Sequence, residues 1–196
     1  MYYKQLKEHF LKKNAGLTRG EVDTLSHYYT EKYIAKGEHL LRGGEICEIE
    51  GYVGKGCFKV YVIDEKGEEK VLYFAAPDWW VVDIDSFENQ GPSELYIQAL
   101  EDSVLLIISR KDKERLYEEM PKVERLFRIM YQKAIVAWQK RLIRNHSISA
   151  EDRYHHFIKT YPEIAEQITN KLIASYLGIT QEFVSVIRKR RLEKNI

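Results

Sequence analysis

Acidic and aromatic residues concentrate in the stretch FAAPDWWVVDIDSF, residues 74–87. Asp78, Asp83 and Asp85 could together supply carboxylate ligands for a divalent cation. No histidine and no further carboxylates with the spacing of a calcium loop accompany them. Catalysis would need a nucleophile or an acid–base pair with an orienting partner, and the chain shows no such pattern. We therefore expect no metal, no cofactor and no enzyme active site.

A second set of chemically capable residues lies in TNKLIASYLGITQEFVSVIRKR, residues 169–190. Thr169 can cap a helix over residues 171–176, and Gly178 can end that helix in a tight turn. Thr180 can then cap a second helix. Two helices joined by a short glycine turn form the helix-turn-helix pattern, which places its second helix in the major groove of DNA.

The side chains of this pattern suit DNA. Gln181, Glu182 and Ser185 would project from the exposed side of the second helix, where each can hydrogen-bond a base edge. The predicted phosphate contacts are the helix starts at Thr169 and Thr180 and the cations Lys171, Arg188, Lys189, Arg190 and Arg191. The predicted packing side comprises Ile173, Ala174, Leu177, Phe183, Val184 and Ile187. A helical hairpin of an ordinary core is the alternative.

Charge is distributed unevenly along the 196 residues. Residues 1–121 carry 16 Lys and Arg against 23 Asp and Glu, a balance of −7. Residues 122–196 carry 15 against 7, a balance of +8. The second part is thus the one suited to a polyanion.

The composition and the chain start indicate a cytoplasmic protein. The chain is 44% hydrophobic and 31% charged, as in globular proteins, and has no apolar run long enough to span a membrane. The N-terminus MYYKQLKEHFLKKN lacks the apolar block of a signal peptide. Cys47 and Cys57 belong to no CxxC or Cys/His motif, so we expect reduced structural thiols.

The elements that carry these residues differ along the chain. The first thirty residues have an amphipathic helical pattern, and residues 33–108 read as short strands of a sandwich or barrel. Within them, residues 58–75 predict two strands about a turn at residues 64–67. A long amphipathic helix follows, whose apolar stripe is Val123, Leu126, Phe127, Met130, Ala134, Ala137 and Trp138. This stripe predicts pairing with a second copy of the helix, and packing within the chain is the alternative.

This order of parts resembles the Crp/Fnr family of bacterial transcription regulators. The resemblance rests on IAKGEHLLRGGEICEIEGYVGKGCFKVYVIDEKGEEKVLYFA and on NKLIASYLGITQEFVSVIRKR, and it extends over nearly the whole chain. It implies an α+β protein with a cyclic-nucleotide-binding-like jelly-roll barrel (a double-stranded β-helix) at residues 1–121. A long dimerisation helix over 122–146 and a helix-turn-helix domain over 147–196, without a following wing, complete the expected architecture.

The resemblance also implies a function. A family member is a cytoplasmic homodimer that binds a palindromic site on double-stranded DNA, acts with RNA polymerase, and couples DNA binding to an effector in the barrel. The alternative is a ligand-sensing or interaction module that does not read DNA.

The sequence departs from the nucleotide-binding members of that family. Their Gly-Glu pair is absent from APDWWVVD, and Ser93-Glu94 stands where an Arg-Ser pair clamps the cyclic phosphate. A carboxylate there would repel a phosphate, so we expect that the barrel does not bind cyclic AMP, and its effector is unknown. Trp79 and Trp80 could fill the space of the nucleotide, or line a remodelled effector pocket together with Asp83, Ser93 and Glu94. The recognition helix departs too, because Val186 stands where relatives often carry a polar DNA-contacting residue.

Overall fold

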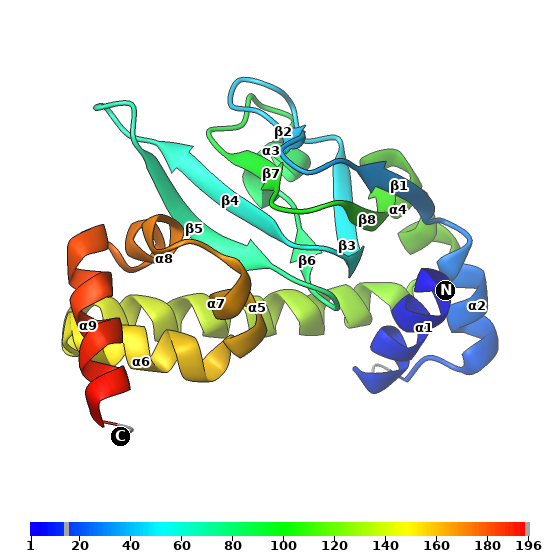
Figure 1. Cartoon of the computed structure of the whole chain (residues 1–196). Coiled ribbons are helices and arrows are strands. Elements are labelled where there is room, and N and C mark those ends of the chain that lie inside the picture. The colour runs from blue at the N-terminus through cyan, green and yellow to red at the C-terminus, as the bar shows by residue number, and fades with distance from the viewer. Residues whose placement is uncertain (14–15, 195–196) are drawn as a thin grey trace. The chain divides into compact units, whose positions relative to one another are not determined.

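The computed structural model describes residues 1–13 and 16–194 of the chain (Figure 1). Contacts group the chain into two compact units, each built from two segments. The first unit comprises Met1–Val60 and Phe74–Ile135, and the second comprises Tyr61–Tyr73 and Val136–Ile196.

The strands form two four-stranded sheets with the orders β1-β8-β3-β6 and β2-β7-β4-β5. Their bounds are β1 Thr30–Ile34, β2 His39–Leu41, β3 Ile49–Lys55, β4 Phe58–Ile63, β5 Glu69–Ala75, β6 Trp80–Val81, β7 Tyr96–Ala99 and β8 Ser103–Ser109. β8 pairs antiparallel with both β1 and β3. The predicted turn between β4 and β5 is present: the Asp64 carboxylate accepts from the backbone of Lys66 and Glu68, and Gly67 supplies a positive φ of 78°.

Helices cover the first of these sheets. The first unit contains α1 (Tyr2–Lys12), α2 (Arg19–Ser26), α3 (Ile84–Asn89), α4 (Arg110–Glu119) and the beginning of α5 (Lys122–Ser147). Side chains from α1, α2, α4 and α5 pack with those of β3 and β8 in one core. The fully buried members of this core include Leu6, Phe10, Leu25, Tyr52, Leu106, Leu116 and Leu126.

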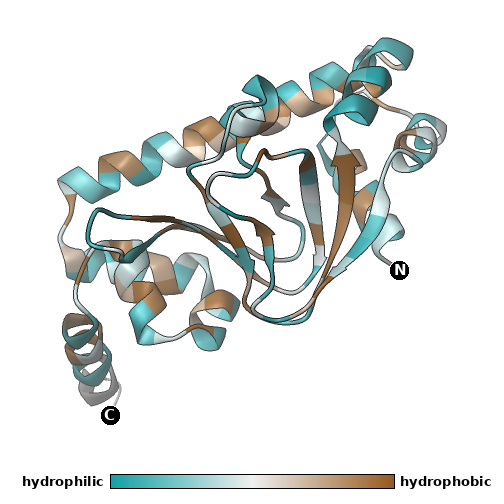
Figure 2. Ribbon diagram, turned by 90° about the horizontal axis from the view of Figure 1, so that it is seen from above, coloured by the Kyte–Doolittle hydropathy of each residue, from teal (hydrophilic) through white to brown (hydrophobic). Residues whose placement is uncertain are grey.

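The long helix α5 agrees with the predicted range, but its apolar stripe has two environments. Val123, Leu126 and Phe127 are buried in the first-unit core. Ala134 and Ala137 are exposed. Packing within the chain therefore accounts for the first half of the stripe. Figure 2 shows the alternation of hydrophilic and hydrophobic residues along the whole helix.

A buried ion pair joins α4 to β3. The Lys113 ammonium lies 2.7 Å from the Glu50 carboxylate, and their side chains are only 3% and 2% exposed. Tyr131 bonds with both groups. The Lys113 nitrogen also lies 4.7 Å from the centre of the Phe127 ring, a cation–π distance. These contacts compensate two charges that burial would otherwise destabilise.

The second unit is mainly helical. Its helices are α6 (Ala150–Thr160), α7 (Pro162–Gln167), α8 (Asn170–Leu177) and α9 (Gln181–Lys194), with the last part of α5. Their core comprises Tyr154, Phe157, Ile164, Ala165, Ile168, Ile173, Ala174, Leu177, Val184 and Ile187. The tip of the β4–β5 hairpin belongs to this unit: the Ser175 hydroxyl donates to the Glu69 carbonyl and accepts from the Val71 amide.

The α+β fold class is as predicted, with the expected barrel realised as two antiparallel sheets. The unit boundaries differ from the predicted limits at 121 and 146, because α5 contributes to both units and the hairpin tip joins the helical one. The three functional domains over 1–121, 122–146 and 147–196 stay a prediction. None of the described helices combines the length and the hydropathy that crossing a membrane would require.

Candidate nucleic-acid interface

The helix-turn-helix is fixed by three local signals. The Thr169 hydroxyl accepts from the Leu172 amide and begins α8, and the Thr180 hydroxyl accepts from the Phe183 amide and begins α9. Gly178 ends α8 with φ +66°, a left-handed conformation that a side chain disfavours. The two helices therefore begin and end where the sequence predicts.

The second helix packs through a narrower side than predicted. Val184 and Ile187 are buried with Ile173 and Ala174 of the same unit. Phe183 was expected among them, but it is 36% exposed. Among the described side chains of α9, the buried apolar residues are Val184 and Ile187, which are three apart and share one side of the helix, and Phe183 lies at the edge of that side.

The predicted base-reading residues lie on the exposed side of α9. Gln181, Glu182 and Ser185 are all exposed. The Ser185 hydroxyl donates to the Gln181 carbonyl and accepts from the Asn170 amide group. Gln181 and Glu182 thus keep their side-chain hydrogen-bonding capacity for another molecule, whereas part of the capacity of Ser185 is used within the unit.

Arg188 has a different environment from the one expected of a phosphate contact. It is half-buried, its Nε donates to the Tyr154 hydroxyl at 3.1 Å, and its Nη2 donates to the Ala165 carbonyl. The guanidinium thereby ties α9 to α6 and α7. Lys189 and Lys171 are exposed, as a phosphate contact requires. The Arg190 guanidinium lies 3.8 Å from the Glu151 carboxylate, and the Arg191 side chain is outside the described residues.

The outer surface of α9 also has an apolar part, which the sequence analysis predicted only in part. Phe183 and Val186 are 36% and 43% exposed, beside Glu182 and Lys189. Val186 stood out in the sequence as a departure from related regulators. The signal for Phe183 was its three-residue spacing from Val186, which places both on one side of a helix.

The residues predicted for an effector pocket have partners inside the first unit. Asp83 caps α3 with one carboxylate oxygen, and its other oxygen accepts from the Ser93 hydroxyl at 2.6 Å. The Ser93 hydroxyl also accepts from the Leu95 amide. Asp83 and Ser93 are buried, and Glu94 is exposed. The Asp83 carboxylate and the Ser93 hydroxyl are thus engaged in holding α3 and the segment before β7.

Trp80 packs in the core between the helices and β3. Its ring lies 5.4 Å from Tyr52, 5.9 Å from Phe10 and 6.1 Å from Phe127, measured between ring centres. Its indole N–H donates to His9. Burial, together with Lys13, lowers the pKa of His9 to about 4, so this imidazole is neutral and can accept. Trp79 is half-buried next to it, and its carbonyl accepts from the Val53 amide. Trp80 is thus a packing residue of this core, and its filling of the space of a nucleotide stays a prediction.

The acidic stretch does not assemble a carboxylate cluster. Asp78 bonds to Tyr52 and Gln5, whereas Asp85 bonds to Asn89. Among the residues that the structure describes, no group of three or more His, Cys, Asp or Glu is arranged to hold a metal ion. Cys47 and Cys57 are free and buried, and burial raises the pKa of both thiols, that of Cys57 to about 12.

The sequence and the fold are similar to those of known proteins. A family model described as cyclic nucleotide-binding domain matches residues 31–120. The Fumarate and nitrate reduction regulatory protein of Yersinia pestis is 28% identical over 194 residues, covering 92% of this chain and 76% of the relative. Electron transport regulator A of Shewanella oneidensis is 27% identical over 182 residues, covering 86% of this chain and 72% of the relative.

A solved structure extends the likeness to the fold. The c-di-GMP-responsive global regulator CLP of Xanthomonas campestris superposes with a TM-score of 0.73 at 13% identity, covering 91% of this chain and 93% of that one. The sheets, the long helix and the terminal helix-turn-helix thus occur in the order found in known regulators. The chain thus contains a region that matches the cyclic nucleotide-binding domain, and over most of its length it is similar to regulators of the Crp/Fnr type.

Proposed function

We propose that this regulator is a cytoplasmic homodimer that binds a palindromic operator through α8 and α9, and that it acts by binding rather than by catalysis. The observation that carries the proposal is the exposed side of α9. Gln181 and Glu182 project there with no role in the packing of the unit, next to exposed cations. A surface of this composition at the start of a second helix suits the major groove.

Base edges would be read by two kinds of contact. Glutamine pairs best with adenine, and glutamate accepts from the amino group of cytosine. Phe183 and Val186 offer apolar surface beside them, and the matching feature in the major groove is the methyl group of thymine. We expect adenine or cytosine opposite Gln181 and Glu182, and thymine opposite Val186.

The phosphate contacts are reduced relative to the sequence prediction. Lys171, Lys189, Arg190, Arg191 and the helix starts at Thr169 and Thr180 remain in the proposed set. Arg188 leaves it, because Tyr154 and the Ala165 carbonyl hold its guanidinium.

Dimerisation is proposed through the exposed part of α5. Ile135 and Leu142 are 58% and 60% exposed, and they lie one heptad apart. Trp138 lies between them at the intermediate position of the same seam, and Val136 and Ile143 repeat the heptad spacing beside it. Such a seam is buried when two copies of a helix pair, which would supply the two recognition helices that a palindrome needs.

The first unit is proposed as a scaffold or sensor whose effector is not cyclic AMP. Ser93 bonds to Asp83, and Glu94 would add negative charge beside a phosphate. RNA polymerase is the proposed partner on DNA, as the family resemblance implies.

The test is selection of bound sequences from a random DNA pool with the full-length protein. We expect enrichment of two symmetric half-sites whose centres lie about 34–36 Å apart, and affinity that falls steeply as salt rises. The absence of enriched half-sites, with binding of all sequences alike, would contradict the proposal and favour an interaction module.

A further inference from the structure

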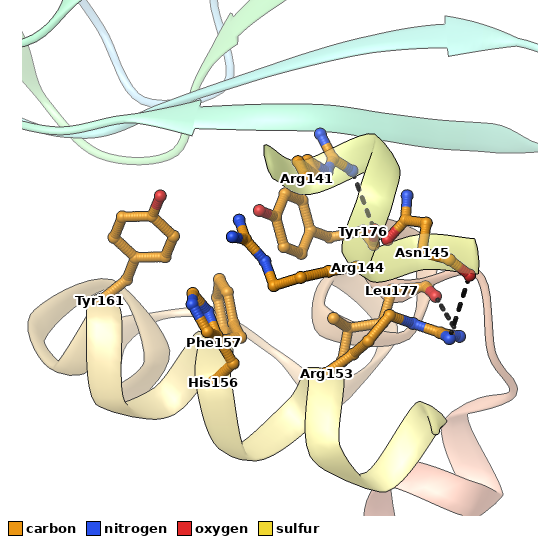
Figure 3. Close-up of a pocket in the computed structure, with 9 residues that line it drawn as sticks. All are labelled: Arg141, Arg144, Asn145, Arg153, His156, Phe157, Tyr161, Tyr176 and Leu177. Carbon is orange, nitrogen blue, oxygen red and sulfur yellow. Dashed lines mark hydrogen bonds between the residues drawn. The ribbon is translucent and has the colours of Figure 1, made fainter. Parts of the chain in front are cut away.

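A pocket lies within the second unit, where the end of α5 meets α6 and the last residues of α8 (Figure 3). Its cavity volume is about 20 Å³, and the pocket is open to solvent on one side, so a ligand would enter from its mouth. The lining residues are Arg141, Arg144, Asn145, Arg153, His156, Phe157, Tyr161, Tyr176 and Leu177. Three of the nine are arginines and none is a carboxylate, so the pocket is strongly basic.

Two of these arginines are held by backbone carbonyls. The Arg141 Nη2 donates to the Tyr176 carbonyl at 3.0 Å, and its guanidinium stacks 4.1 Å from the centre of the Tyr176 ring. The Arg153 guanidinium donates to the carbonyls of Ile148 and Leu177. These contacts hold both guanidinium groups in place, and among the described residues neither group is paired with a carboxylate.

Arg144 is the third cation, and it extends across the pocket between Tyr176 and His156 (Figure 3). Within the described part of the chain it makes no hydrogen bond and no ion pair. Burial lowers the pKa of Arg141, and the Arg144 charge lowers it further. Burial also lowers the pKa of His156, with Arg144 and Lys159 adding to the effect. The positive charge of Arg144 thus disfavours the protonated forms of its two neighbours in the pocket, Arg141 and His156.

We propose that this pocket binds an oxyanion, the phosphate group of a small ligand or of DNA. A phosphate would neutralise charges that now repel one another, and the planar guanidinium donates two parallel hydrogen bonds to such an oxyanion. The buried Arg153 Nε, which has no partner among the described atoms, is a further donor in the same wall.

Occupation of the pocket would bear on DNA binding. Arg141 and Arg144 come from α5, Arg153 and His156 from α6, and Tyr176 from α8. An anion contacted by all three helices would stabilise their arrangement within the unit, including the first helix of the helix-turn-helix. This consequence depends on the proposed function, whereas anion binding itself does not.

The direct test is calorimetric titration of the full-length protein, without DNA, with inorganic phosphate and with pyrophosphate at constant ionic strength. We expect saturable binding of one anion per chain. Arg144→Gln should weaken it by roughly tenfold or more, since it removes a charge-assisted contact. Arg144→Lys, which keeps the charge but not the fork of donors, should weaken it less.

Lys140→Gln is the matched control, because it removes one exposed positive charge from the same helix outside the pocket. It should leave phosphate binding within about twofold, since exposed charges are screened. Circular dichroism and urea unfolding would verify that every variant is folded. An absence of saturable binding in the wild type, or equal binding by Arg144→Gln and the wild type, would overturn the proposal.

The source of the phosphate is decided by adding a short DNA duplex. If the duplex displaces phosphate from the wild type and Arg144→Gln weakens duplex binding, the site takes a backbone phosphate of DNA. If duplex and phosphate bind together, the site takes a small ligand. Because phosphate binding is measured without DNA, a failure of the operator selection would leave this result intact.

Discussion

Polar residues in two regions of this protein were expected to contact ligands, and their environments differ. Asp83 and Ser93 in the first unit bond to each other and to backbone amides, and both are buried. Gln181 and Glu182 in the second unit are exposed at the start of α9. A polar group whose bonds are complete stabilises the fold, whereas one that is available can recognise a partner. We therefore propose a structural role for the first region and a recognition role for the second.

The charged residues of the two units show the same contrast. Lys113 in the first unit is neutralised by Glu50 and surrounded by aromatic rings. Arg141, Arg144 and Arg153 in the second unit line one pocket that no carboxylate lines. The charge of Lys113 is balanced within the first unit, whereas the proposed counter-charge for the three arginines is an anion bound from outside.

The largest expected effect is in the first unit. Lys113→Met should lower the free energy of unfolding by about 3–5 kcal/mol, because it leaves the Glu50 charge buried and uncompensated. Urea denaturation would measure the change. The double variant with Glu50→Gln should recover much of the loss, and a single-variant loss below about 1 kcal/mol would show that the pair is not structural.

Substitutions on the exposed side of α9, which we call the recognition surface (Gln181, Glu182, Phe183, Ser185, Val186 and Lys189), should change DNA binding and leave stability unaltered. Replacing Gln181 and Glu182 together by alanine should remove about 1–3 kcal/mol of discrimination per lost bidentate base contact. The free energy of unfolding should stay within about 0.5 kcal/mol, since both residues are exposed. Competition binding with base-substituted operators would measure the discrimination. An unchanged base preference would mean that another surface reads the DNA.

A pair of serine substitutions compares the two regions directly. Ser93→Ala should lower the free energy of unfolding by about 1–3 kcal/mol, because a buried Asp83 oxygen loses its hydroxyl donor. Ser185→Ala, at an exposed position, should change it by at most about 0.5 kcal/mol. Thermal and urea unfolding would test both. Equal losses of stability in the two variants would contradict the inference that Ser93 stabilises the fold and Ser185 does not.

The apolar part of the recognition surface predicts a smaller effect. Replacing thymine by uracil opposite Val186 deletes one methyl group and should cost about 0.8 kcal/mol of binding, the value for one buried methylene. Uracil at positions between the half-sites is the control. Val186→Ala should reduce the difference between the two bases, and an undiminished difference would assign thymine recognition to another residue.

The smallest expected effect is on the salt dependence of DNA binding, and it distinguishes Lys189 from the adjacent Arg188. Lys189→Gln should reduce the slope of log affinity against log salt by about 0.9, the value for one phosphate contact on duplex DNA. Arg188→Gln should leave that slope unchanged and instead lower stability, because Tyr154 and Ala165 lose their donor. A reduced slope in Arg188→Gln would return this arginine to the phosphate-contacting set.

Much of this architecture was predictable because its signals are local. The caps at Thr169 and Thr180, the turn at Gly178 and the 3.6-residue period of α5 each depend on residues within a few positions of one another. The α+β order of strands followed by helices, and with it the family resemblance, could therefore be read along the chain.

What only the tertiary structure decided involves partners distant in sequence. Arg188 bonds to Tyr154, 34 residues earlier, and Lys113 pairs with Glu50, 63 residues earlier. Trp80 packs with Phe10 and Phe127, and three arginines from two helices line one pocket. Periodicity tells which side of a helix is apolar, but not which distant side chain it meets. The sequence alone therefore determined the elements and the helix-turn-helix, whereas folding decided which polar groups are satisfied internally and which remain available for recognition.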